Sequence, residues 1–278
     1  MRLYATIVYL FLYTPIALIV LFSFNSGRHA SDFRGFSTQW YGIAANNPFV
    51  TEALQNSLII AFTASILATI FGTSAALALQ RVRGIPRVLF DGAIYVAIMV
   101  PGIVIGISTL IALVTLFDML NPVLAMIWPG GAENAPSLNL GYGSVIAAHT
   151  LFTMALVIII VRARFAGMDR ALIEASMDLY ATPWRTFRQI TLPQIFPAVM
   201  AGFLLSFTFS FDDFVIAFFV AGPNTTLPIY VFASIRRGVT PEINAIGTAV
   251  MAVSLTLLFA AQLLLRARDR RQRAAAAD

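Results

Sequence analysis

Two adjacent carboxylates, Asp212 and Asp213, stand inside an otherwise apolar run of this sequence. On a helix, Ser206, Ser210 and Asp213 would share one face at positions i, i+4 and i+7, and Phe211 directly precedes the pair. A carboxylate at the centre of a hydrocarbon layer costs at least about 2.5 to 3.5 kcal/mol, so both should face protein or a wet passage. An acidic passage beside aromatic rings attracts cations by charge and by cation–π contact. These five residues predict a path for a cationic solute; the alternative is that the carboxylates only bond a partner subunit.

A second polar pattern lies in residues 162–197, an Arg-rich segment between two apolar runs. Apolar residues at helical spacing predict a short helix over residues 169–179. Thr182 followed by Pro183 is typical of an N-cap and the first residue of a second short helix, so a bend is expected between the two. Such a bent, amphipathic segment fits either a groove on a cytosolic partner or the surface of a lipid layer.

Both patterns must be positioned by membrane-spanning helices. Hydrophobic residues make up 59% of the 278 residues and charged residues only 11%, so too few charges are present to cover a soluble globule. A spanning helix needs about 20 apolar residues. We predict an all-α integral membrane protein, a single transmembrane domain over residues 1–278, with six helices. They are expected near residues 3–24, 57–79, 92–117, 143–161, 198–220 and 244–265.

The arginines predict the orientation of these helices. All 18 basic residues are Arg, and 14 of them fall on one side if the helices alternate. The positive-inside rule then places both termini in the cytoplasm, together with a basic tail at residues 266–278 that would lie against anionic headgroups. The basic charge is explained by topology, so binding to nucleic acid is not expected.

Missing residue types exclude several kinds of chemistry. The sequence has no Cys and only two His, which excludes disulfides, thiolate metal sites and a His-Glu-x-x-His zinc site, so no metal site or cofactor is expected on this chain. It also has no Lys, so it lacks the P-loop that an ATPase of that type requires. An intramembrane aspartyl protease needs Asp residues on two helices, whereas Asp212 and Asp213 share one helix. We therefore expect no catalytic residues.

The segment between the fourth and fifth predicted helices resembles the EAA loop of binding-protein-dependent ABC importer permeases. The matching positions are Glu174, Ala175, Ser176, Ala181, Ile190, Leu192 and Pro193, followed by Pro197-Ala198 and Ala201-Gly202. The resemblance implies the type I importer fold, a bacterial inner-membrane location, and a coupling helix seated on a separate ATPase subunit that binds ATP and Mg. It also places Tyr180 and Thr182 in the elbow of the coupling segment.

Two positions depart from the family pattern. Ser176 replaces the second Ala, and Tyr180 stands where the family usually has Gly. Since Gly adopts positive φ freely, Tyr180 implies either a different elbow or some backbone strain.

The resemblance narrows to the second permease subunit of spermidine/putrescine importers. It rests on the runs Asn25-Ser26, Thr38-Gln39-Trp40-Tyr41, Ala53-Leu54, Asn56-Ser57-Leu58, Ser206 to Asp213, Gly222-Pro223 and Pro241-Glu242. This subtype works as half of a permease heterodimer, with two ATPase subunits and an extracytoplasmic substrate-binding protein. Trp40 and Tyr41, in a predicted external loop, are candidates for docking the binding protein, although aromatic residues near helix ends are often simply interfacial.

The sequence specifies the transported solute less well than it specifies the permease subtype. Similar polyamine subunits often carry an acidic residue after the proline of the third helix, whereas this chain has Gly102 after Pro101. A smaller amine or an amino-acid-like cation is therefore an alternative. An ion-coupled secondary transporter is a weaker one, because we find no obvious inverted repeat.

Overall fold

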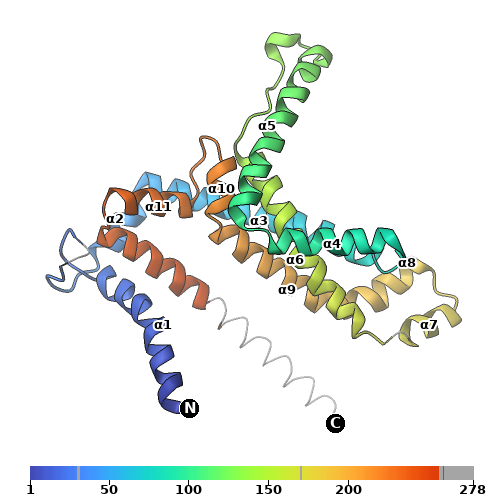
Figure 1. The fold of residues 1–278 in the computed structure, drawn as a ribbon, viewed down its shortest axis with the longest axis horizontal. Helices are drawn as coiled ribbons and strands as arrows, with labels where there is room; N and C mark the ends of the chain where they lie inside the picture. The colour runs from blue at the N-terminus through green and yellow to red at the C-terminus, as the bar shows by residue number, and fades with distance from the viewer. Residues whose placement is uncertain (30–31, 170, 257–258, 260–278) are drawn as a thin grey trace. The chain divides into compact units, whose positions relative to one another are not determined.

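The computed structural model describes residues 1–29, 32–169, 171–256 and 259 (Figure 1). Within these residues the secondary structure is helical, and the only β interaction is an isolated bridge between Asn25 and Phe36. The chain forms two compact units, one made of Met1–Thr51 with Tyr230–Asp278 and the other of Glu52–Ile229. The predicted all-α class is confirmed for the described part of the chain.

The first unit contains α1 (Arg2–Ser23), α2 (Gln39–Asn46) and helical residues 241–256, with the start of α3 (Pro48–Ala78) and most of α11 (Leu227–Arg237). The loop after α1 is folded around Asn25, whose side chain is fully buried. Its Oδ1 accepts from the backbone N–H groups of Gly27 and Arg34, and its Nδ2 donates to the carbonyls of His29 and Asp32. One side chain therefore fixes the course of this loop.

The second unit is built around α6 (Tyr142–Ala166), which packs along α9 (Leu192–Asp212). Its other elements are α4 (Ile85–Met99), α5 (Gly102–Ile127), η1 (Ala132–Asn134), α7 (Ala171–Asp178), α8 (Pro183–Thr186), a π-helix η2 (Phe187–Thr191) and α10 (Val215–Val220). Glycines allow the close packing: a Cβ on Gly72 of α3 or on Gly202 of α9 would lie 2.8 or 3.3 Å from the side chain of Val157. Val157 of α6 is itself fully buried.

Five helices among the described residues are long and apolar enough to cross a membrane. They are Leu3–Ser23, Pro48–Ala78, Gly102–Ile127, Tyr142–Ala166 and Pro183–Asp212. The sixth predicted span, residues 244–265, is helical up to residue 256, and the rest of it, except residue 259, lies outside the described residues, as does the predicted basic tail at 266–278.

Two helices that the hydropathy predicts as continuous are interrupted in the structure. The expected span 92–117 is divided between α4 and α5 at Val100 and Pro101, whose ψ angles of 131° and 136° are extended. A residue before proline is disfavoured in the helical region, which explains this break. The expected span 198–220 is divided between α9 and α10 at Asp213, whose ψ is 120°. Apolar residues continue on both sides of each break, so the hydropathy of the flanking segments does not locate the breaks.

The turn between α10 and α11 is tied to two other helices by polar side chains. Asn56 of α3 donates to the carbonyl of Thr225 at 2.9 Å and accepts from the hydroxyl of Tyr142. Ser57 accepts from the backbone N–H of Leu227 at 2.8 Å. The Asn-Ser pair noted in the sequence thus has a clear structural task, which is to hold this turn against α3 and α6.

Candidate functional site

The segment between α6 and α9 forms the bent pair of short helices that the sequence predicts. Glu174, Ala175 and Ser176 lie on α7, and α8 begins after Thr182, whose hydroxyl accepts from the backbone N–H of Arg185 at 3.4 Å. Pro183 is the first residue of α8, as expected for a helix start. We call residues 171–191, comprising α7, the bend, α8 and η2, the elbow. Ile190 falls in η2, and Leu192 and Pro193 open α9.

Tyr180 occupies the bend with φ = 56°, and it is the only non-glycine residue with positive φ among the described residues. The backbone N–H of Ala181 donates to the carbonyl of Ser176 at 3.1 Å, and that of Tyr180 donates to Met177 at 2.9 Å. This pair of bonds is a Schellman motif, which requires a left-handed residue where Tyr180 stands. The chain therefore keeps the glycine-type elbow and carries the backbone strain of a tyrosine in it.

Tyr180→Gly should stabilise the elbow by about 0.5 to 1 kcal/mol, because the left-handed conformation costs glycine no steric strain. The measurement is hydrogen exchange at the amide of Ala181, which should slow by about 2- to 5-fold. Tyr180→Val is the matched control, since a β-branched residue tolerates positive φ poorly and should speed the same exchange. Equal exchange in all three proteins would contradict a left-handed bend.

Ser176, the other departure from the family pattern, joins the two helices of the elbow. Its hydroxyl lies 2.8 Å from the hydroxyl of Thr186 on α8, and both side chains are buried. An alanine at this position could make no such bond. The serine therefore replaces a simple apolar contact by a buried hydrogen bond that fixes one helix against the other.

Ser176→Ala should destabilise the elbow by about 1 to 3 kcal/mol, because it leaves the buried hydroxyl of Thr186 without its partner. Ser176→Ala combined with Thr186→Val should cost less than the sum of the single changes, since both polar groups are then gone. A double-mutant cycle on the exchange rates of elbow amides measures this coupling. Additive effects would show that the two hydroxyls do not interact.

The tip of the elbow presents apolar side chains to the surroundings. Leu179 is 82% exposed, Tyr180 96% and Trp184 69%. Apolar clusters of this kind on a polar segment mark protein or membrane contacts. Glu174 lies in the first turn of α7, where a negative charge favours the helix dipole.

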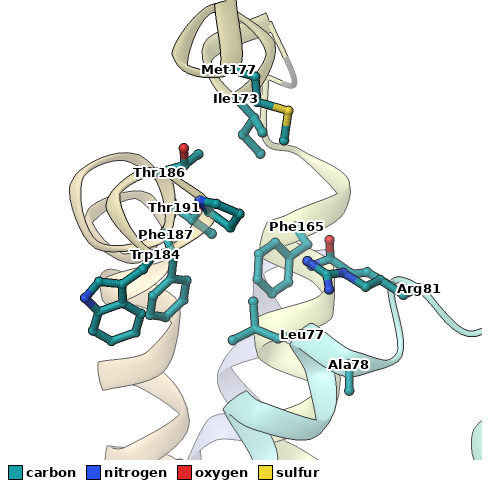
Figure 2. A pocket seen from close by; sticks show the side chains of 12 residues that line it. Leu77, Ala78, Arg81, Phe165, Ile173, Met177, Trp184, Thr186, Phe187 and Thr191 are labelled. Carbon is teal, nitrogen blue, oxygen red and sulfur yellow. The ribbon is translucent and has the colours of Figure 1, made fainter. Parts of the chain in front are cut away.

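A cavity of about 540 Å³ separates the elbow from the ends of α3 and α6 (Figure 2). Trp184 and Phe187 stand on the elbow side, with ring centroids 5.7 Å apart, and Leu77 and Phe165 stand opposite them. On this side the elbow lacks continuous packing against α3 and α6. Few packed contacts mean a small free-energy cost for shifting the elbow relative to them.

The break after α9 brings Asp213 together with His149 of α6. Oδ2 of Asp213 accepts from the backbone N–H of Ala217 at 3.0 Å, which caps the start of α10, and lies 3.3 Å from Nε2 of His149. The His149 contact is close but is not a well-aligned hydrogen bond. Nδ1 of His149 lies 2.7 Å from Oγ of Ser210, and the imidazole is 2% exposed. The histidine thus links α6 to both sides of the break.

The other residues predicted to line a solute path are divided between two faces of α9. Ser206 and Ser210 are buried. Phe211 is half-buried and its ring stacks on Phe207 at 6.0 Å. Asp212, the last residue of α9, is exposed. Within this unit the structure therefore brings Ser210 and Asp213 together and points Asp212 elsewhere.

The two helix breaks lie next to each other. Gly102 at the start of α5 and Gly106 one turn later both face α10: a Cβ on Gly102 would lie 3.7 Å from Val215, and one on Gly106 would lie 2.7 Å from the ring of Phe219. The small residues after Pro101 thus permit α10 to pack directly on α5. Gly102 therefore adjoins the break that carries Asp212 and Asp213.

An ion network that the sequence analysis did not predict joins α4 and α6. Arg87 and Arg162 both donate to Asp91, and Arg87 also donates to the carbonyl of Leu79 at the end of α3. Asp91 precedes the apolar run that starts at Gly92, so it lies outside the membrane-spanning segments. The hydrogen bond from Arg162, with that from Arg87, holds the pKa of the Asp91 carboxyl below its ordinary value against the opposing effect of burial. The i, i+4 spacing of Arg87 and Asp91 on a helix is the sequence pattern that could have predicted their ion pair.

Trp40 and Tyr41, at the start of α2, use their polar atoms in bonds to the segment that follows α1. Nε1 of Trp40 donates to the carbonyl of Asn25 at 2.8 Å, and the hydroxyl of Tyr41 lies 2.7 Å from that of Ser23. Phe36, which stacks on Phe24, is 75% exposed. Trp40 and Tyr41 therefore help to position Phe36, the most exposed aromatic side chain of this segment.

No group of three or more His, Asp or Glu residues that could hold a metal ion occurs in the described ranges.

Comparisons with known proteins agree with the resemblance seen in the sequence. Residues 68–274 match the family described as binding-protein-dependent transport system inner membrane component. The chain is 36% identical over 264 residues to the spermidine/putrescine transport system permease protein PotC of Escherichia coli strain K12, covering 95% of this chain and 92% of that protein. It is 39% identical over 268 residues to the putrescine transport system permease protein PotI of the same strain, covering 95% and 90%.

Among solved structures, a bacterial ABC transporter involved in the import of the acidic polysaccharide alginate has a similar fold, with a TM-score of 0.69 at 17% identity. The match covers 94% of this chain and 93% of that one. At such low identity the likeness concerns the fold alone. The predicted class of a multi-pass, non-enzymatic importer subunit is confirmed by the family match and the two permease relatives. This chain belongs to the binding-protein-dependent transport system inner membrane components and is a permease subunit of an ABC importer of the inner membrane.

Proposed function

We propose that this chain forms one half of a permease heterodimer that imports a polyamine or a related cationic amine. Two ATPase subunits, which bind ATP and Mg, would drive it, and an extracytoplasmic binding protein would deliver the solute. The permease relatives PotC and PotI are named for spermidine and putrescine transport, and they match the chain over nearly its whole length. The observation that carries the coupling role is the exposed apolar tip of the elbow.

The proposed topology has six spanning helices in one domain, with both termini and the elbow in the cytoplasm. The arginine distribution supports it. ATP binding would close the ATPase subunits and pull the elbow, which would rock α9 because η2 leads into α9 without a break. The solute cavity would then open outward, and hydrolysis would reset it.

On the outer side, the loop around Asn25 is the proposed docking surface for the binding protein. Trp40 and Tyr41 would act in it by fixing the loop through their bonds to Asn25 and Ser23. Phe36 would then supply exposed aromatic surface.

A smaller amine or an amino-acid-like cation is the second candidate solute, since Gly102 supplies no carboxylate beside the helix breaks. Loss of one negative charge weakens a site for several ammonium groups more than a site for one.

Uptake into proteoliposomes containing the assembled transporter tests the proposal. With binding protein outside and ATP available to the ATPase subunits, labelled putrescine or spermidine should accumulate, and vanadate should stop it. Uptake that collapses with an uncoupler while ATP stays high would instead indicate an ion-coupled carrier. Vanadate-sensitive uptake of amino-acid-like cations without uptake of either polyamine would favour the second candidate.

A further inference from the structure

We infer that Asp212 is the carboxylate that meets the cationic solute, and that Asp213 is a positioning residue that holds the helix break. This inference rests on the proposed function, because it assigns the two charges of that same path. The two side chains are neighbours in sequence, but the structure gives them different surroundings.

The side chain of Asp213 is already held by contacts within this chain. One oxygen, Oδ2, both accepts the backbone N–H of Ala217 and faces Nε2 of His149, and the side chain is only 18% exposed. The cap matters because α10 starts at Val215, two residues after the extended Asp213, and its first N–H groups have no partner within the helix. His149 in turn contacts Ser210 on the other side of the break. Asp213 is therefore needed to shape the break, and one of its oxygens is already in contact with a buried histidine.

Asp212 has no hydrogen bond or ion pair in the part of the chain that the structure describes. Asp212 lies at the C-terminal end of an exposed face of α9. The same face contains Leu205, Thr208 and Phe209, which precede Asp212 by seven, four and three residues. Lipid cannot cover this face at Asp212, because a carboxylate in the hydrocarbon layer is strongly disfavoured. In the assembled transporter it must face water or the second permease subunit, and a translocation path lies between two such subunits.

The neighbours of Asp212 suit an amine. The hydroxyl of Thr208 bonds to the carbonyl of Leu204 at 3.0 Å, so its oxygen keeps acceptor capacity. The ring of Phe209, one helical turn before Asp212, is 46% exposed and can receive a cation on its face. A carboxylate, a hydroxyl and an aromatic face on one side of a helix are the groups that recognise an ammonium ion.

The test uses the complete transporter in proteoliposomes, with putrescine and spermidine as probes. Asp212→Asn should raise the KM for uptake at least 10-fold and leave the melting temperature of the complex unchanged, and Asp212→Glu, which keeps the charge, should restore most of the affinity. Asp213→Ala should lower the melting temperature, while the KM of the folded fraction stays within about 3-fold of wild type. Asp213→Asn keeps an acceptor for the Ala217 N–H and remains measurable if the alanine variant fails to assemble.

Three results would overturn the inference. The first is an unchanged KM in Asp212→Asn; the second is a 10-fold rise in KM in Asp213→Asn with normal melting. The third is loss of the partner permease from purified Asp212→Asn, which would make this residue an interface contact. If the wild-type transporter takes up neither polyamine, the proposed solute is refuted, and the role of Asp212 with it. The wild-type control alone distinguishes this outcome from the three results above.

Discussion

Leu179→Asp will reduce ATP-driven uptake at least about 10-fold and will lower the amount of ATPase subunit that purifies with the permease. Leu179 is 82% exposed at the tip of the elbow, so the change does not disturb packing within this chain. In the assembled transporter the side chain is expected to be buried against the ATPase, where an unpaired carboxylate is costly. Loss of 2 kcal/mol or more at such a contact corresponds to about 30-fold in affinity.

Ile85→Asp is the matched control for this variant. Ile85 is 76% exposed at the start of α4, so the same change from an apolar to an acidic residue is made away from the elbow. A carboxylate is tolerated at this position because it is a helix N-terminus. It should leave uptake and ATPase recovery near wild type. Normal uptake and recovery in Leu179→Asp would contradict docking through the elbow tip.

Gly222→Ala should lower the stability of the permease by at least about 2 kcal/mol, which corresponds to a fall of roughly 5 °C in melting temperature. Gly222 has φ = 57°, and an added Cβ would lie 2.5 Å from the carbonyl oxygen of Leu140. That carbonyl belongs to backbone and cannot rotate away. The neighbouring segment is also held, since Leu138 exchanges two hydrogen bonds with the side chain of Asn121.

Gly143→Ala provides the control for this second variant. Gly143 lies in the first turn of α6 and an added Cβ there would meet nothing within 4 Å, so helix propensity should make the change neutral or stabilising by up to about 1 kcal/mol. Thermal melting of the purified transporter measures both variants. Equal melting temperatures would show that the turn at Gly222 is not left-handed.

The sequence predicts the helical class, most of the spanning segments and the elbow, because each depends on local signals. Hydropathy marks the apolar runs, and Thr182-Pro183 marks the start of α8 through the chemistry of an N-cap and a first-turn proline. The break at Val100 could have been predicted from a local rule of the same kind, because Val100 precedes Pro101.

The break at Asp213 and its surroundings could not be predicted locally. They depend on His149, 64 positions earlier in the sequence, and on the packing of α10 against α5 at Gly106. The pairing of Ser176 with Thr186 also depends on the angle between α7 and α8, which the composition of the elbow does not fix. Residues that act through such contacts become visible only when the helices are placed.

Cross-linking from single cysteines tests the central claim, that the elbow seats on the ATPase. The chain has no Cys, so Tyr180→Cys and the control Ile85→Cys each create one labelling site. A benzophenone maleimide attached at Tyr180→Cys should, after irradiation, give one product with the ATPase subunit, whose yield changes with nucleotide, while Ile85→Cys gives little. Labelling of Tyr180→Cys from the outer face, or the absence of an ATPase product at this position, would contradict the account.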